Sequence, residues 1–69
     1  MLHLRISVPA DHTSGVVAVL ERAPAVSRLA VLDGASRRPQ GDVVLADVAR
    51  EAANDICDEL LELGVVPRL

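Results

Sequence analysis

Residues 41–54, "GDVVLADVAREAAN", decide the fold because a strand-like run passes directly into a helix-like one. In residues 43–48, Val44, Ala46 and Val48 share one side of an extended chain, as in a strand with one face in the core. The apolar residues that follow recur at steps of three and four, which is the spacing of a helix with one buried face. They are Ala49, Ala52, Ala53, Ile56, Leu60 and Leu63.

The first part of the chain predicts another strand and another helix. In "MLHLRISV", residues 1–8, apolar and polar residues alternate, which indicates a strand with one buried side. The stretch "ADHTSGVVAVLERA" predicts a helix over residues 12–23, with Asp11 or Thr13 as its N-cap. The apolar face of this helix is expected to contain Val16, Val17 and Leu20, with Val19 adjacent.

The middle of the chain predicts a hairpin. Residues 26–32, "VSRLAVL", have the composition of a second strand that precedes the one over 43–48. Between them, residues 33–42, "DGASRRPQGD", contain glycines and a proline, which are typical of turns. We expect this segment to be a long hairpin loop.

The order strand, helix, strand, strand, helix favours an α+β sandwich of the ferredoxin-like, ACT-like kind, with two helices on one face of an antiparallel sheet. Residues 1–64 would form this single domain, and Gly64 would end its second helix. Residues 65–69 would be a C-terminal stub, in which a fourth strand is missing or truncated. Without that strand, we expect the edge of the first strand to keep unpaired backbone groups that another chain could bind.

Composition limits the classes of function. The 69 residues are 51% apolar but include no Phe, Tyr or Trp, so the core consists of small side chains. A domain of this size buries only about 60% of the surface that its unfolded chain exposes. We therefore expect association to add stability. The net charge of −3, the absence of lysine and the absence of stacking aromatic rings argue against nucleic acid as a partner.

The sequence also predicts the cellular setting. The single cysteine, Cys57, cannot form an internal disulfide, which favours a cytosolic protein. The N-terminal stretch alternates in polarity and does not have the continuous apolar segment of a signal peptide. No apolar run reaches the length of about 18 residues that is needed to cross a bilayer.

Asp47, Arg50, Glu51 and Asn54 form the first candidate site, because residues three and four apart on a helix face the same way. A small ligand could bind such a polar cluster. We favour an ordinary strand-to-helix corner, where an acid near the helix N-terminus stabilises the helix dipole by about 0.3–1 kcal/mol. An enzyme would have to use Asp47, Glu51 and Arg50 as acid, base and anchor. No nucleophile or cofactor motif accompanies them, so we expect no catalysis.

Arg37 and Arg38 form the second candidate site, at the tip of the predicted hairpin. Two adjacent positive charges could bind an anion or a lipid headgroup. Recognition of anionic lipids generally uses clusters of about 4–8 basic residues. The interpretation that we favour is therefore a solvated hairpin tip.

Metal binding and cysteine catalysis find no support in the sequence. The potential ligands are His3, His12, Asp11 and Cys57, and their spacing matches no zinc motif. Cys57 lies in a predicted helix with acidic neighbours, which disfavour a thiolate. No glycine-rich phosphate-binding motif is present. We expect neither a metal nor a cofactor.

The predicted sheet face without helices mixes apolar and polar side chains. The apolar ones are Ala30, Leu32, Val43 and Leu45, and the polar ones are His3, Arg5, Arg28 and Asp47. Such a face suits a second copy of the domain or another segment of the same protein, and the alternative is a tolerated apolar patch. We expect a homo-oligomer that uses either this face or the edge of the first strand.

The stretches "MLHLRISVPAD", "VVAVLE", "LAVLDGASRRPQGDVVLADVAREAAN" and "LLELG" resemble the beginning of the uncharacterised hydrophobic-domain membrane proteins, domain of unknown function family 389. The resemblance extends from Met1 to about Gly64 and is most specific from Leu29 to Asn54. It implies a soluble N-terminal domain followed by a multi-helix membrane region, with no established activity. This chain lacks the strand expected after the second helix and every membrane span, so it resembles an excised portion.

Together, the residues and the resemblance predict a non-catalytic cytosolic domain that regulates or assembles a multi-spanning protein of the cell membrane. Such a domain could sense a small ligand between subunits, which is an analogy from the fold alone. The alternative is a free-standing protein-interaction or dimerisation module, which needs no membrane partner.

Overall fold

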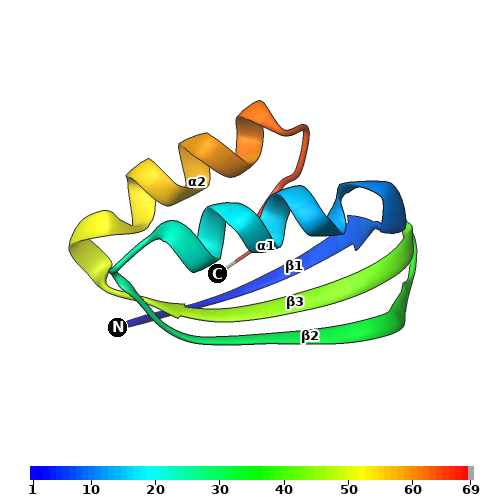
Figure 1. The fold of residues 1–69 in the computed structure, drawn as a ribbon, viewed down its shortest axis with the longest axis horizontal. Coiled ribbons are helices and arrows are strands. Elements are labelled where there is room, and N and C mark those ends of the chain that lie inside the picture. Colours follow the sequence, from blue (N-terminus) through cyan, green and yellow to red (C-terminus); the bar gives the residue numbers. More distant parts are fainter. Residues whose placement is uncertain (69) are drawn as a thin grey trace.

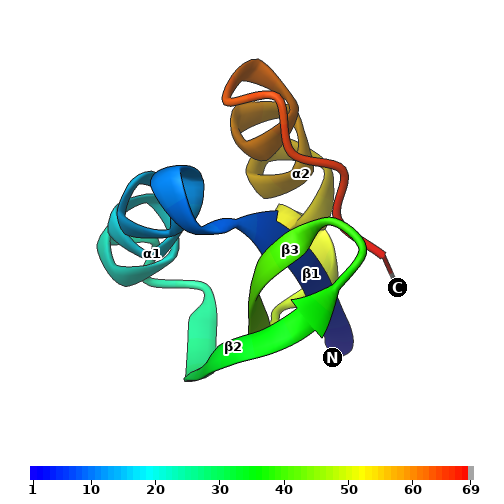
Figure 2. The ribbon, with the colours of Figure 1, turned by 90° about the vertical axis from the view of Figure 1, so that its right-hand side faces the viewer.

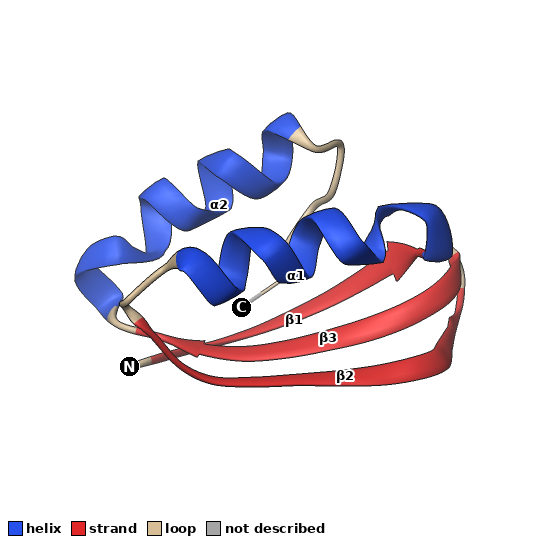
Figure 3. Ribbon diagram, viewed as in Figure 1, coloured by secondary structure: helices blue, strands red, loops and turns tan. Residues whose placement is uncertain are grey.

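The structure, a computed structural model, describes residues 1–68 and arranges them in two layers. Both helices lie on one face of a three-stranded antiparallel sheet (Figures 1 and 3). In chain order the elements are β1 (Leu2–Pro9), the 3₁₀ turn η1 (Ala10–His12), α1 (Thr13–Arg22), β2 (Val26–Arg37), β3 (Gln40–Val48), the 3₁₀ turn η2 (Arg50–Ala52) and α2 (Ala53–Glu62). The predicted α+β class is confirmed.

β3 occupies the centre of the sheet, between β1 and β2. It pairs with β1 along the whole of that strand, from Leu2 opposite Val48 to Pro9 opposite Gly41. It also pairs antiparallel with β2. In β1, in β3 and in β2 between Arg28 and Leu32, alternate residues face the helices and the residues between them face away.

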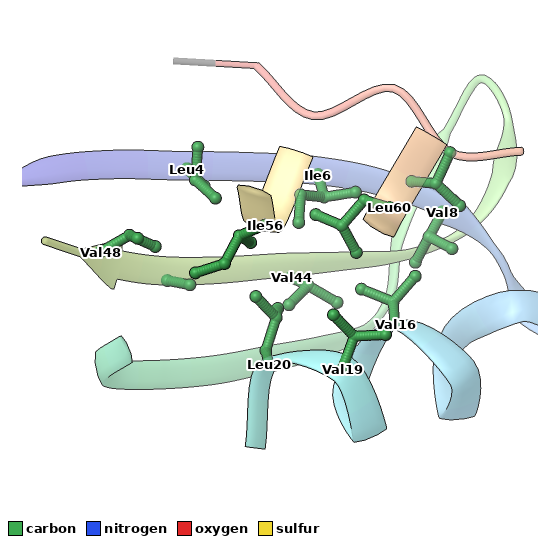
Figure 4. Close-up of a cluster of buried hydrophobic side chains, with 12 residues drawn as sticks. Leu4, Ile6, Val8, Val16, Val19, Leu20, Val44, Val48, Ile56 and Leu60 are labelled. Carbon is green, nitrogen blue, oxygen red and sulfur yellow. The ribbon is translucent and has the colours of Figure 1, made fainter. Parts of the chain in front are cut away.

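The core fills the space between the helices and the sheet (Figure 4). The sheet contributes alternate residues of β1 and β3, as the strand period predicts: Leu4, Ile6, Val8, Val44, Ala46 and Val48. The remaining buried apolar residues are Val16, Val19, Leu20, Ala53, Ile56, Leu60 and Val65. In α1, Val19 is buried and Val17 only partly so, which turns the buried face slightly from the predicted one.

The hairpin between β2 and β3 is more regular than the predicted loop over residues 33–42. Both strands extend into this segment and leave a tight turn, so the prediction of a long loop is wrong. The register shifts between Leu32 and Ser36, and Gly34 adopts a φ of 67° within this irregularity. The Ser36 hydroxyl donates to the Pro39 carbonyl at 2.6 Å, and the peptide bond before Pro39 is cis. The glycines and the proline serve a bulge and a turn within paired strands.

The N-terminus of α1 is bound to the β2–β3 hairpin and has no N-cap side-chain hydrogen bond. Neither Asp11 nor Thr13 forms the predicted N-cap, because η1 precedes α1 and no side-chain cap hydrogen bond is present in residues 13–22. The Thr13 hydroxyl instead donates to Asp42 Oδ2 at 2.6 Å. Asp42 Oδ1 accepts the backbone N–H of Gly34 at 2.8 Å. Asp42 therefore joins the bulge of the hairpin to the start of α1.

The predicted end of α2 at Gly64 is confirmed. Gly64 has a φ of 83°, which suits a residue without a side chain. Its N–H donates to the Leu61 carbonyl at 2.9 Å, and the Val65 N–H donates to the Leu60 carbonyl at 3.1 Å. These two bonds are those of a Schellman motif, which turns the chain back towards the sheet.

The residues after α2 run beside the outer edge of β1 (Figure 4). Arg5 and Arg68 exchange two backbone hydrogen bonds, of 2.8 and 3.0 Å, in an isolated antiparallel bridge. The prediction that this edge of β1 is unpaired is therefore wrong at Arg5. Within residues 1–68 the pairing stays at this single bridge, and no fourth strand is formed.

We expect Ile56→Asp to unfold the domain. Ile56 is 3% exposed in the core, and an unpaired carboxylate there would cost several kcal/mol. Arg38→Ala, at the exposed hairpin tip, should leave folding unchanged. Thermal unfolding followed by circular dichroism measures both variants, and equal melting temperatures for Ile56→Asp and the parent would refute the assigned core.

Replacing Gly41 and replacing Gly15 by alanine should have opposite effects on the stability of the domain. A Cβ at Gly41 would lie 2.1 Å from the Val8 carbonyl oxygen, so Gly41→Ala should prevent β1 and β3 from pairing normally and should strongly destabilise the domain. A Cβ at Gly15 would meet Leu63 Cδ1 at an ordinary 3.8 Å. Gly15→Ala, in α1, should stabilise by about 0.5–1 kcal/mol. Urea unfolding of both variants tests this, and similar shifts for the two would contradict it.

Candidate functional site

The sheet face away from the helices is uncovered throughout residues 1–68 (Figure 2). The register aligns its side chains in three rows that cross β1, β3 and β2 in that order. We call these nine residues the open face. The rows are His3, Asp47 and Arg28; Arg5, Leu45 and Ala30; and Ser7, Val43 and Leu32. The face is charged at one end and mainly apolar at the other.

Asp47 is the centre of the charged row. Its Oδ1 pairs closely with His3 Nδ1 from β1, and its Oδ2 lies 3.9 Å from Arg28 Nε of β2. The side chain of Asp47 is 19% exposed, against 81% for His3 and 85% for Arg28. A carboxylate between two potential cations therefore links all three strands on the open face.

This position changes the interpretation of the corner cluster. Asp47 faces its partners across the sheet, and within residues 1–68 no hydrogen bond or ion pair joins it to Arg50, Glu51 or Asn54. Those three side chains are exposed on η2 and α2. Neither helical segment has a side-chain cap hydrogen bond at its start. The structure thus separates Asp47 from the helix residues that follow it in sequence.

The two hairpin arginines are also separated. Arg38 lines a hollow together with Arg68, next to the outer edge of β1, whereas Arg37 does not line that hollow. Sequence reasoning did not connect Arg68 with the hairpin, because the two meet only after α2 has turned the chain back.

Two shallow depressions lie on the open face, on either side of Leu45. The one towards β2 has a volume of about 470 Å³ and includes Arg28 and Ala30 in its lining. The one towards β1 has a volume of about 390 Å³ and includes His3 and Arg5. Asp47 lines both depressions. Each depression therefore combines the apolar middle of the open face with charged side chains from its charged end.

The remaining reactive groups form no combined site. Within residues 1–68 no three His, Cys, Asp or Glu side chains lie together as a metal-binding group. Cys57 is partly buried, and this burial, together with the charge of Asp58, raises the pKa of its thiol. The thiol form is therefore favoured, as the acidic neighbours in the sequence predict.

Comparisons with known proteins identify no relative of this chain. No family model, curated protein or solved structure matches the chain. Among the helices formed by residues 1–68, none has both the length and the apolar character that crossing a membrane requires.

Asp42 predicts a pH dependence of stability. The N–H of Gly34, and next the hydroxyl of Thr13, lower the pKa of Asp42 below its ordinary value of 3.8. The folded state therefore favours the carboxylate, and this contribution is complete above pH 3.8 and is lost as the pH falls through the lower pKa of the folded state.

We expect Asp42→Asn to be less stable than the parent at pH 7, and the difference to shrink as the pH falls below about 4. Asp33→Asn is the matched control, because the Asp33 side chain is exposed and forms none of the side-chain hydrogen bonds or ion pairs found within residues 1–68. Urea unfolding between pH 7 and pH 2.5 provides the measurement. A constant difference for Asp42→Asn across this range would contradict the role of its charge.

Proposed function

We propose that this chain is a non-catalytic domain that assembles with a second copy of itself through the open face. In this proposal the fold is ferredoxin-like and ACT-like, and the bridge between Arg5 and Arg68 is the first pair of a fourth strand beside β1. The sheet order β1-β3-β2, with a C-terminal segment outside β1, is compatible with that topology.

The observation that carries the proposal is the apolar character of a sheet face that no other layer within residues 1–68 covers. Leu32 is 47% exposed and Leu45 is 37% exposed on this face, next to Ala30 and Val43. A domain without aromatic residues has few other means of burying apolar area. Packing a second sheet at about 10 Å would bury this surface, as in two-sheet sandwiches.

We further propose that the domain is the cytosolic regulatory or assembly part of a multi-spanning membrane protein. The support is the resemblance of residues 1–64 to the uncharacterised hydrophobic-domain family. The two depressions beside Leu45 would lie within the assembled interface, where a small ligand could be enclosed between subunits. Asp47, shared by both depressions, would then be the polar group nearest to such a ligand.

The alternative proposal is a free-standing dimerisation module, supported by the same open face. The two proposals differ in what the natural gene encodes after Leu69. Apolar stretches of about 18 residues or more there would favour the membrane protein. A stop codon, or a continuation without such stretches, would favour the free-standing module.

We expect the domain to self-associate at micromolar concentration and Leu45→Glu to weaken the association at least about tenfold, since a carboxylate would be buried at the interface without a partner. Leu61→Glu is the matched control, because Leu61 is a 52% exposed leucine on α2, outside the open face. Sedimentation equilibrium measures the dissociation constants, and circular dichroism verifies folding. A parent protein that stays monomeric, or equal effects of the two variants, would refute the proposed interface.

A further inference from the structure

A hollow of about 340 Å³ lies where the tip of the β2–β3 hairpin meets the C-terminal segment. Figure 4 shows this tip beside the segment that runs along β1. Arg38 and Arg68 contribute the two charged side chains of its lining, and Ser7 contributes a further polar group. Its volume is within the range of about 300–1,000 Å³ that is typical of small-molecule sites.

Each side of the hollow is fixed by contacts within the fold. On the hairpin side, the bond from the Ser36 hydroxyl to the Pro39 carbonyl holds the turn that carries Arg38. On the other side, two backbone hydrogen bonds hold Arg68 against Arg5. Both positions are therefore set by the backbone and not only by long side chains.

The positive charge around the hollow is not neutralised by residues 1–68. Neither Arg38 nor Arg68 forms an ion pair with these residues, and the same holds for Arg5. Arg5 and Arg68 are direct cross-strand partners, and like charges in such a pair destabilise a sheet. An anion next to Arg68 and Arg38 would relieve this repulsion.

Ser7 supplies a backbone donor in addition to its hydroxyl. Arg5 directs both its N–H and its C=O away from β3, towards Arg68. Backbone groups two residues apart in a strand point to the same edge, so the N–H of Ser7 also points to the outer edge of β1. No backbone acceptor within residues 1–68 occupies this N–H.

We infer that this hollow binds the phosphate group of a phosphate monoester. Such a group carries a charge of about −1.5 to −2 at neutral pH and three acceptor oxygens, which match two guanidinium groups and the donors of Ser7. Pro9, Pro39 and Val66 line the remainder of the hollow and suit the organic part of the ester. Ser7 is the only residue of the open face that lines the hollow, and neither Asp47 nor Leu45 does, so the inference does not rest on the proposed assembly.

The test is an NMR titration of the 69-residue chain with glycerol 3-phosphate at low ionic strength. The amide signals of Ser7 and Gly64 should shift on binding. Arg38→Ala and Arg68→Ala should each weaken binding about tenfold or more, which corresponds to about 1.4 kcal/mol. Arg37→Ala is the matched control and should change the dissociation constant less than about twofold, because Arg37 is adjacent in sequence but outside the hollow.

A second arm distinguishes a soluble ester from a lipid headgroup. Phosphatidylcholine vesicles with phosphatidic acid present the same phosphate monoester, and flotation measures the bound protein. The site is supported if the parent and Arg37→Ala bind either probe more tightly than Arg38→Ala and Arg68→Ala do. The probe that binds then shows whether the phosphate belongs to a soluble ester or to a lipid headgroup. No binding to either probe, or an Arg37→Ala variant as weak as Arg38→Ala, would overturn the inference. Circular dichroism of each variant ensures that lost binding is not lost folding.

Discussion

The packing of one sheet face, and only one, is the constraint on which the rest of the structure depends. The helices and the inner sides of β1 and β3 enclose a core of Ala, Val, Leu and Ile without any aromatic ring. Two ten-residue helices cannot cover both sides of a sheet. The open face therefore retains the exposed side chains of Leu32 and Leu45, and burying them would add stability.

The position of β2 follows from polar contacts more than from the core. None of its apolar side chains is fully buried, and Ser36 is its one buried residue. Its pairing with β3, the bonds of Asp42 to Gly34 and Thr13, and the turn at Pro39 hold it in place. Asp42 therefore ties the edge strand β2 to the start of α1.

The period of apolar residues was sufficient to predict the number, type and order of the helices and strands, because each element buries one side. The end of α2 could also be predicted, since Gly64 is a local signal. The close pairing at the end of the hairpin could not be predicted, because the requirement for glycine at position 41 comes from the Val8 carbonyl of another strand. The strand period also placed Asp47 and His3 on the same sheet face. Their direct pairing could not be predicted, because His3 is 44 residues away in sequence and only the register of β1 and β3 brings the two together.

The central claim is that the domain completes its packing with a second copy of itself. Urea unfolding at several protein concentrations tests this claim most directly, because binding that occurs only in the folded state adds stability by mass action. We expect the midpoint to rise between roughly 1 and 100 µM, by a free energy on the order of 2–3 kcal/mol for a saturated interface. A midpoint that is independent of concentration over this range would mean that the isolated domain is stable without a partner, and would contradict the account.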